Sequence, residues 1–205
     1  KKSIQKDNVK RTGDFRPDPK VRKGSASPRD YYNTGYDRGH MAPAGDMNFD
    51  KRAMSETFYM SNMSPQIRNF NGGIWRELEE STRDWAYDNG EIYVVTGPVL
   101  TQGIREKIGE NGVSVPDLYY KVILDISEPD KKGIAFLIPN EVSYKPLSAY
   151  AVSINEVEAL TGIDFFYQFL PDDFEETLES MNDINRWRIS DKRHDLRVEN
   201  WNKRK

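Results

Sequence analysis

The feature that most constrains the fold of this chain is one long amphipathic segment, residues 72–89. Its inward-facing positions recur four or three residues apart, which is the spacing of one face of an α-helix. The residues that carry this spacing are Ile74, Leu78, Thr82 and Trp85. Gly90 follows the segment directly and supplies a stop signal. The pattern therefore predicts a long helix that packs one face against a core.

Three strand-like runs follow this helix, and each is bounded by Gly, Pro or acidic turn residues. They cover residues 91–95, 118–126 and 133–138, and we expect them to form an antiparallel sheet. A further short strand is expected at 57–60, with a turn at 62–65. Strands mixed with separate helices predict an α+β fold with a central antiparallel sheet flanked by helices.

The remaining segments show weaker local signals. Residues 1–35 are basic and rich in turn formers, so they are expected to be mostly loop. The sequence Ser153-Ile154-Asn155-Glu156 fits a capping box that opens a short helix, and Gly162 would close it. Residues 171–181 favour another short helix, and the charged run 182–205 is expected to be helical or frayed.

Composition limits the class of protein. With 205 residues and 37% hydrophobic content, the chain can bury one sizeable core, and we expect a single domain over 1–205. No run approaches the roughly 18 apolar residues of a membrane span, so no membrane partner is expected. The absence of cysteine excludes disulfides, thiolate zinc sites and cysteine nucleophiles. The cellular compartment stays open.

Charge is segregated along the chain, although the net charge is only −3. Residues 1–83 carry 16 Lys and Arg against 11 Asp and Glu, residues 84–185 carry 6 against 19, and residues 186–205 carry 8 against 3. Basic ends could attract phosphates while the acidic middle faces elsewhere. A merely solvated charged surface is the alternative interpretation.

Only two histidines occur, His40 and His194. His194 lies in a charged run and is expected to be an exposed surface residue. A lone histidine is usually structural, but an imidazole with an ordinary pKa near 6.5 can take a proton from water at neutral pH. If the chain is a hydrolase, His40 is the first candidate for its general base.

The segment Asp37-Arg38-Gly39-His40 resembles the signature of the DNA/RNA non-specific endonucleases, a family with the ββα-metal (His-Me finger) fold. Residues 57–66 (TFYMSNMSPQ) resemble the strand and turn that follow in the family. Further matches lie at Asn71, Trp75, Leu78, Glu79 and Arg83, and upstream at Phe15-Arg16-Pro17-Asp18. This similarity covers residues 11–90. The family normally has a β-hairpin before the first residue of this chain, so we expect that hairpin to be missing here.

The resemblance implies roles for particular residues. His40 is the implied general base, and Asn71 is the implied single protein ligand of Mg²⁺, with Mn²⁺ as a substitute ion. Magnesium prefers oxygen ligands and keeps several waters, which suits a neutral amide oxygen. The other implied catalytic residues are Arg38, Asn62, Glu79, Arg83 and Arg11. The alternative for Asn71 is a helix cap or turn residue, and that role is compatible with metal binding.

Several of these roles have competing interpretations. Glu79 lies eight residues after Asn71, about 12 Å along a helix, so it is expected to act through an ordered water that the metal holds. Arg83 suits a phosphate oxygen, although an exposed Glu79–Arg83 ion pair is the simpler alternative. Asn62 would orient the site or merely form a turn. The family usually has a further arginine upstream that assists the reaction, and in this chain it could be either Arg11 or Arg16. Asp37 is expected to hold a loop, and Arg38 either contacts phosphate or locks that loop.

Together these features predict a magnesium-dependent, sequence-nonspecific endonuclease that acts on the backbone of DNA or RNA and leaves 5′-phosphate and 3′-hydroxyl ends. The main alternative is a catalytically silent nucleic-acid-binding module in which His40 is structural. No other hydrolase signature is present, because the chain has no Gly-x-Ser-x-Gly elbow and no paired-histidine zinc helix. A homodimer is a further expectation from similar nucleases.

Overall fold

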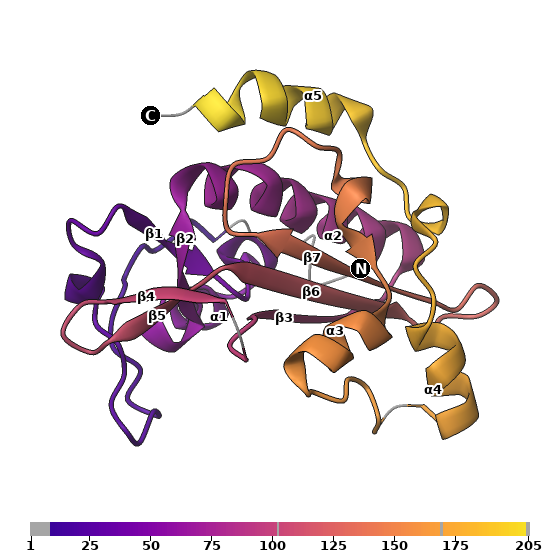
Figure 1. The fold of residues 1–205 in the computed structure, drawn as a ribbon, viewed down its shortest axis with the longest axis horizontal. Helices are drawn as coiled ribbons and strands as arrows, with labels where there is room; N and C mark the ends of the chain where they lie inside the picture. The colour runs from indigo at the N-terminus through magenta and orange to yellow at the C-terminus, as the bar shows by residue number, and fades with distance from the viewer. Residues whose placement is uncertain (1–8, 102, 169, 204–205) are drawn as a thin grey trace.

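A four-stranded antiparallel sheet with helices on both faces forms the centre of the molecule (Figure 1). The computed structural model describes residues 9–203 except 102 and 169. The strand order is β3-β6-β7-β8, with bounds Tyr93–Pro98, Leu118–Asp125, Lys132–Pro139 and Ala151–Val152. The antiparallel sheet and the α+β class expected from the sequence are confirmed. Strand β3 begins two residues later than predicted.

The two faces of the sheet bury separate hydrophobic clusters because side chains alternate along each strand. On β6, Tyr119 and Ile123 pack with the residues of helix α2 (Arg76–Asn89). Tyr120 and Val122 belong to the cluster on the opposite face, which helices α3 (Ile154–Thr161) and α4 (Asp172–Glu179) cover. Lys121 stands between these positions and shares the α2 side of the strand, where it is 1% exposed.

The predicted long helix is confirmed, and its first turn is irregular. A π-helical turn, Phe70–Trp75, precedes α2, and Gly73 within it has a non-helical backbone (φ −106°, ψ −112°). Helix α2 ends at Asn89, and Gly90 follows with φ +88°, a conformation that glycine adopts without a steric penalty. Such π-helical turns recur at functional sites. This one carries Asn71.

A two-stranded antiparallel sheet lies before α2 and pairs β1 (Tyr36–His40) with β2 (Met63–Ile67). The turn expected at 62–65 is therefore wrong, since β2 runs through Pro65. Proline is tolerated because its missing N–H is not needed there, while its carbonyl accepts bonds from Tyr119 Oη (2.8 Å) and Asn140 Nδ2 (3.1 Å). Both donors come from the large sheet and its following loop, beyond the reach of local sequence patterns.

The strand expected at 57–60 is also wrong. Helix α1 (Lys51–Glu56), capped by Asp50, occupies the preceding residues, and a turn and a 3-10 helix follow it. Phe58 and Met60 are buried in the core, which explains their strand-like apolar alternation without strand pairing. The only regular pairing in this stretch is a single bridge between Tyr59 and Arg16.

The other helices largely follow their sequence signals. Ser153 and Glu156 form the predicted capping box of α3, and Gly162 ends it with φ +71°. Helix α4 lies within the predicted range, and α5 (Asp191–Glu199) packs on the side of α2 that is turned away from the sheet (Figure 1). A hairpin of β4 (Ile104–Ile108) and β5 (Val113–Pro116) was not predicted.

Short 3-10 helices occupy Pro28–Tyr31, Ala44–Met47, Met60–Asn62, Leu147–Tyr150, Ile184–Arg186 and Trp201–Lys203. From residue 9 onward, the rest of the basic N-terminal segment is mostly loop, as expected. The predictions for residues 1–8 and 204–205 lie outside the described residues. None of the helices in the described ranges combines the length and the apolar character needed to cross a membrane.

Candidate active site

His40 ends strand β1 with its imidazole buried against aromatic rings. The side chain is 8% exposed, and its ring meets Phe58 edge-on at 5.0 Å between centroids, with Phe15 at 6.0 Å. Among the described residues, Nε2 is buried and has no hydrogen-bond partner. Burial, reinforced by the positive charge of Arg11, lowers the pKa of His40 from 6.5 to about 4. The imidazole is therefore neutral at pH 7 and has an unused ring nitrogen.

The close approach of β1 and β2 explains why the residue before His40 is glycine. A Cβ at Gly39 would overlap the side chain of Gln66, which lies fully buried on β2. Any larger residue would push the strands apart and move His40. The glycine of the Asp37-Arg38-Gly39-His40 segment is thus required by packing.

Asn71 lies inside the π-helical turn, not at a helix cap. Its Nδ2 donates to Asp37 Oδ2 at 3.1 Å, and this bond orients the amide. The amide oxygen Oδ1 accepts no hydrogen bond recorded among the described residues, so its lone pairs remain available. Asp37 also accepts a long contact from Arg68 Nη2 at 3.5 Å. The expected loop-holding role of Asp37 thus takes the specific form of holding Asn71.

Six of the sequence-predicted residues line one cavity of about 330 Å³, which we name the basic cleft. These residues are Arg11, Arg38, His40, Asn71, Glu79 and Arg83. They come from the N-terminal loop, β1, the π-helical turn and α2, and the fold brings them together although the chain separates them widely. Arg76 and Glu80 line the same cleft and were not predicted.

The arginine ambiguity upstream has a clear geometric answer. Arg11 lines the basic cleft, with its guanidinium carbon 4.9 Å from the Phe58 ring centre. Arg16 instead binds Asp14 Oδ2 at 2.6 Å and the Ser55 carbonyl at 3.0 Å. Arg38 reaches the cleft from β1, and its guanidinium stacks 4.1 Å from the Phe15 ring centre. This cation–π contact uses the face of the Arg38 guanidinium, so the N–H groups, which lie in the guanidinium plane, can still donate hydrogen bonds.

Glu79 and Arg83 lie one turn apart on α2, yet they do not form the simple ion pair considered above. Arg83 Nη1 instead binds Asp46 Oδ1 at 2.9 Å, on the loop after β1. Burial raises the pKa of Glu79 to about 7, while the charges of Lys121 and Arg83 oppose that rise. Glu79 can therefore exchange a proton near neutral pH.

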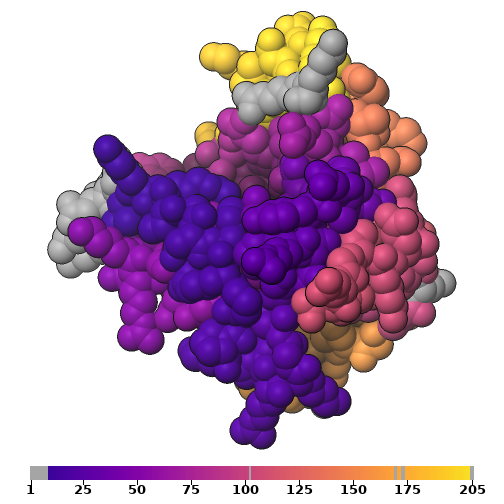
Figure 2. Space-filling view, turned by 90° about the vertical axis from the view of Figure 1, so that its left-hand side faces the viewer, coloured from indigo at the N-terminus to yellow at the C-terminus, as the bar shows by residue number. Residues whose placement is uncertain are grey.

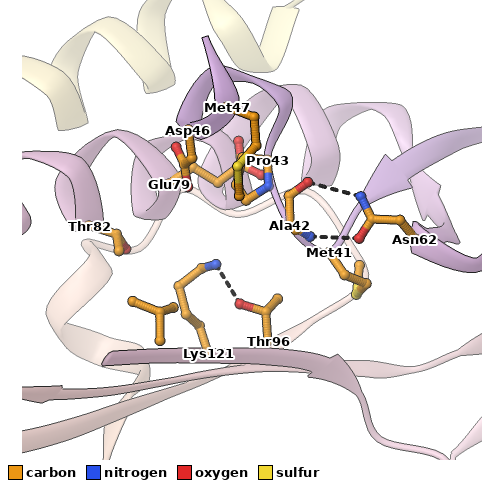
Figure 3. A pocket seen from close by; sticks show the side chains of 11 residues that line it. Met41, Ala42, Pro43, Asp46, Met47, Asn62, Glu79, Thr82, Thr96 and Lys121 are labelled. Carbon is orange, nitrogen blue, oxygen red and sulfur yellow. Dashed lines mark hydrogen bonds between the residues drawn. The ribbon is translucent and has the colours of Figure 1, made fainter. Parts of the chain in front are cut away.

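Asn62 does not line the basic cleft. Its amide accepts from Ala42 N and donates to Ala42 O, both at 2.9 Å, and also donates to Thr57 O (Figure 3). These bonds hold the loop that leaves His40. A residue that orients His40 would have to lie at such a position. The effect of Asn62 on a reaction stays a prediction.

Lys121 is a residue of the site that the sequence pattern missed. It rises from β6 into a second cavity, which also contains Glu79 and Asp46, and Nζ donates to Thr96 Oγ1 at 2.8 Å (Figure 3). Burial lowers its pKa, and the negative charges of Glu79 and Asp46 oppose this change. The available signal was a single lysine inside the apolar run 118–126.

His194 is not the exposed residue that the sequence suggested. It is half-buried on α5, and its Nδ1 faces Arg197 Nη2 at 2.9 Å. The surrounding helix docks onto α2, which explains the burial. His194 lies outside the basic cleft.

Comparison with known protein families gives a match to the DNA/RNA non-specific endonuclease family over residues 1–172. The human mitochondrial nuclease EXOG is 39% identical over 183 residues, covering 81% of this chain and 50% of that protein. Nuclease C1 of Cunninghamella echinulata var. echinulata is 39% identical, covering 74% of this chain and 66% of the relative. The chain thus spans about half the length of human EXOG.

The solved structure of the EndoG/EndoGI complex provides a match in three dimensions. It has a TM-score of 0.75 and 35% sequence identity, and the match covers 82% of this chain and 76% of that chain. This likeness confirms the predicted fold class. Because the family match covers most of the residues and includes the whole basic cleft, the chain belongs to the DNA/RNA non-specific endonuclease family.

Proposed function

We propose that this chain is a magnesium-dependent endonuclease that hydrolyses the phosphodiester backbone of DNA or RNA without reading its sequence. The observation that carries the proposal is the arrangement of the basic cleft. A neutral, unpartnered His40 nitrogen shares the cleft with an oriented amide oxygen and four arginines. The printed names of its relatives, nuclease EXOG and nuclease C1, agree with this chemistry.

The residues present fit a magnesium ion. The Asn71 amide is turned by Asp37 so that its oxygen remains available, and an oxygen donor with several waters suits Mg²⁺. The described part of the chain holds no group of three His, Asp or Glu that could cage a metal, so the fit rests on Asn71 and solvent. When bound, Mg²⁺ would polarise the scissile phosphate and stabilise negative charge on the departing oxygen. Mn²⁺ would be the substitute ion.

The chain's own residues supply the proton transfers. His40 Nε2 takes a proton from water as the water oxygen attacks phosphorus, and the bond from phosphorus to the 3′ oxygen breaks. Glu79, with its pKa near 7, supports return of a proton through an ordered water to that 3′ oxygen. The products are 5′-phosphate and 3′-hydroxyl ends.

The arginines explain the expected lack of sequence preference. Arg11, Arg38 and Arg83 offer planar donors to phosphate oxygens, and phosphate contacts carry no direct sequence information. Arg83 keeps its orientation through Asp46. A silent binding module would also use these arginines. It would have no need of a buried imidazole that stays neutral and unpartnered.

Cleavage of supercoiled plasmid, single-stranded DNA and RNA tests the proposal directly, with Mg²⁺ and with chelator. We expect Mg²⁺-dependent cutting by the natural chain and a loss of about 10²–10⁴-fold in His40→Ala, as is typical for removal of a general base. His194→Ala is the matched control and should cut normally. End-labelling reads the product ends.

Two results would contradict the proposal. One is a His40→Ala chain that melts normally and still cuts within a few-fold of the natural rate. The other is a natural chain that binds nucleic acid in Mg²⁺ without cutting it, which would favour the silent module. A homodimer stays a prediction for sedimentation to check.

A further inference from the structure

Another pocket adjoins the basic cleft and shares two lining residues with it. It has a volume of about 300 Å³, and four aromatic side chains contribute to its lining. We name it the tyrosine pocket, after its residues Tyr31, Tyr32 and Tyr36. Arg38 and Asn71 line both this pocket and the basic cleft. A strand held at Asn71 for cleavage would therefore pass directly beside the tyrosine pocket.

Tyr32 presents most of its side chain to solvent. It is 63% exposed, whereas its neighbour Tyr31 is 5% exposed. An exposed aromatic face beside cationic side chains is the arrangement that binds unpaired bases, because every base has a flat π-face that can stack. Tyr31 adds an unsatisfied polar group, since its buried hydroxyl has no hydrogen-bond partner among the described residues.

The loop that carries Tyr32 is firmly held. Tyr32 N donates to Arg29 O at 3.1 Å, and the buried Asp30 carboxylate accepts from Asn111 N and Nδ2 at 3.2 and 2.8 Å. Asn111 lies in the turn between β4 and β5, and this hairpin lies beside the N-terminal segment on the molecular face in Figure 2. A fixed aromatic platform loses little conformational entropy on binding.

Arg68 supplies a positive charge at the same pocket. Its side chain is 61% exposed, and its contact to Asp37 Oδ1 measures 3.5 Å, which is the outer limit of a hydrogen bond. A phosphate oxygen that enters the pocket would meet this guanidinium, which lines it. Asp37 would still hold Asn71, at 3.1 Å.

We propose that the tyrosine pocket is a nucleotide subsite, in which Tyr32 stacks on the base next to the scissile phosphate and Arg68 binds that nucleotide's phosphate. The inference rests on the function proposed for the adjoining basic cleft. A base can reach Tyr32 only when it is unstacked from its neighbours. The preferred substrate class is therefore single-stranded or locally opened nucleic acid.

Binding is measured with His40→Ala as the background, so that substrate stays intact. We expect Tyr32→Ala to weaken binding of a single-stranded oligonucleotide by about 5- to 100-fold, as for the loss of one base–aromatic stack. Tyr32→Phe keeps the ring and should bind within a few-fold of the background. Tyr87→Ala is the matched control, because Tyr87 is 56% exposed on α2 and lies outside both cavities.

Three further measurements separate stacking from general loss of affinity. A fully paired hairpin should lose less affinity than the single strand when Tyr32 is replaced. An oligonucleotide that lacks its bases should bind Tyr32→Ala and the background equally. Arg68→Gln should lower the slope of log affinity against log salt by about one, as for one lost phosphate contact.

With His40 present, Tyr32→Ala should raise KM for single-stranded DNA while kcat stays within about two-fold, because stacking contributes equally to substrate and transition state. Unchanged single-strand affinity in a normally melting Tyr32→Ala chain would overturn the subsite, even if Mg²⁺-dependent cutting persists. An equal loss of affinity for base-free strands in Tyr32→Ala would also overturn the subsite. Absence of cutting by the natural chain would instead overturn the proposed function, while the binding results would still decide the subsite.

Discussion

In His40 and Glu79, one physical cause shifts two pKa values in opposite directions. Burial favours the uncharged form of each group, so it lowers the pKa of the imidazole to about 4 and raises that of the carboxyl to about 7. Arg11 strengthens the effect on His40. Near neutral pH the cleft therefore contains a neutral base and an acid that still carries part of its proton.

The His40 pKa can be measured without ambiguity because the chain has only two histidines. In His194→Ala, the imidazole signals in a nuclear magnetic resonance titration come from His40 alone. We expect a midpoint near pH 4, since burial and Arg11 both oppose protonation. A midpoint at or above 6.5 would contradict the buried, neutral base.

Asn71 and Asp37 give a second prediction at this scale. Asn71→Ala removes the proposed ligand oxygen, so Mg²⁺ affinity in a calorimetric titration and cleavage should fall together while the melting temperature stays nearly constant. Asp37→Ala keeps the oxygen but frees the amide to rotate, so a smaller loss of Mg²⁺ affinity is expected. Asn155→Ala, on α3, is the control. Unchanged Mg²⁺ affinity in Asn71→Ala would move the ligand role elsewhere.

At the scale of elements, α3 and α4 bring several carboxylates together on one side of the sheet. Glu179 ends α4 and is 4% exposed. Burial raises its pKa to about 8, and nearby acidic charges add to the rise. The residues that supply these charges are Glu158, Glu175, Asp164 and Glu176. Docking of α4 thus favours a protonated Glu179.

This arrangement makes stability depend on pH. The unfolded chain releases the Glu179 proton near pH 4.5, whereas the folded chain holds it until about pH 8. Folding stability is therefore lost as pH rises between these values. Glu179→Gln avoids this loss, so we expect its melting temperature to exceed that of the natural chain by at least about 2 °C at pH 8 and to match it at pH 4. Exposed Glu141→Gln is the control, and a pH-independent difference would refute the argument.

At the scale of the whole molecule, the C-terminal segment docks onto the back of the helix that carries the site. Arg197 and Glu77 are both fully buried, and Arg197 Nε donates to Glu77 Oε2 at 2.5 Å. Arg197 also donates to the carbonyls of Ser143 and Lys145. The guanidinium carbon of Arg76, a residue of the basic cleft, lies 3.9 Å from the ring centre of Trp201.

Removing one partner of this buried pair should be costly. Arg197→Met leaves the Glu77 carboxylate without its partner, and we expect a loss of about 3–5 kcal/mol in the free energy of unfolding, measured with denaturant. The double variant Arg197→Met with Glu77→Leu should recover most of that loss. Lys192→Met, at an exposed position of α5, serves as the control. A single variant as stable as the natural chain would contradict the docking argument.

The segregated charges of the sequence meet one another in the folded chain. The arginines of the described C-terminal segment pair with acidic residues of helix α2 and of the middle segment, so their charge holds these parts of the chain together. These pairs are Arg186–Asp130, Arg188–Asp88, Arg193–Asp84 and Arg197–Glu77. That the basic ends attract phosphates stays a prediction, and in the N-terminal half Arg11 and Arg38 line the basic cleft.

The sequence by itself determined the long helix, the three main strands of the central sheet, helix α3 and six of the twelve residues that line the basic cleft. The helix through residue 89 and the capping box of α3 depend on contacts within four residues, so periodicity reveals them. His40, Asn71 and Glu79 were found through the resemblance of short motifs. That residues 1–205 form one domain stays a prediction.

Only the tertiary structure decided which polar groups meet. Pro65 continues a strand because Tyr119 and Asn140 satisfy its carbonyl, and Lys121 enters the site because β6 turns that residue toward α2. The choice of Arg11 over Arg16 follows from an ion pair that holds Arg16 elsewhere. Each outcome depends on groups that meet only in the folded chain, where burial sets their charge states and hydrogen bonds, and a local sequence pattern contains no information about those neighbours.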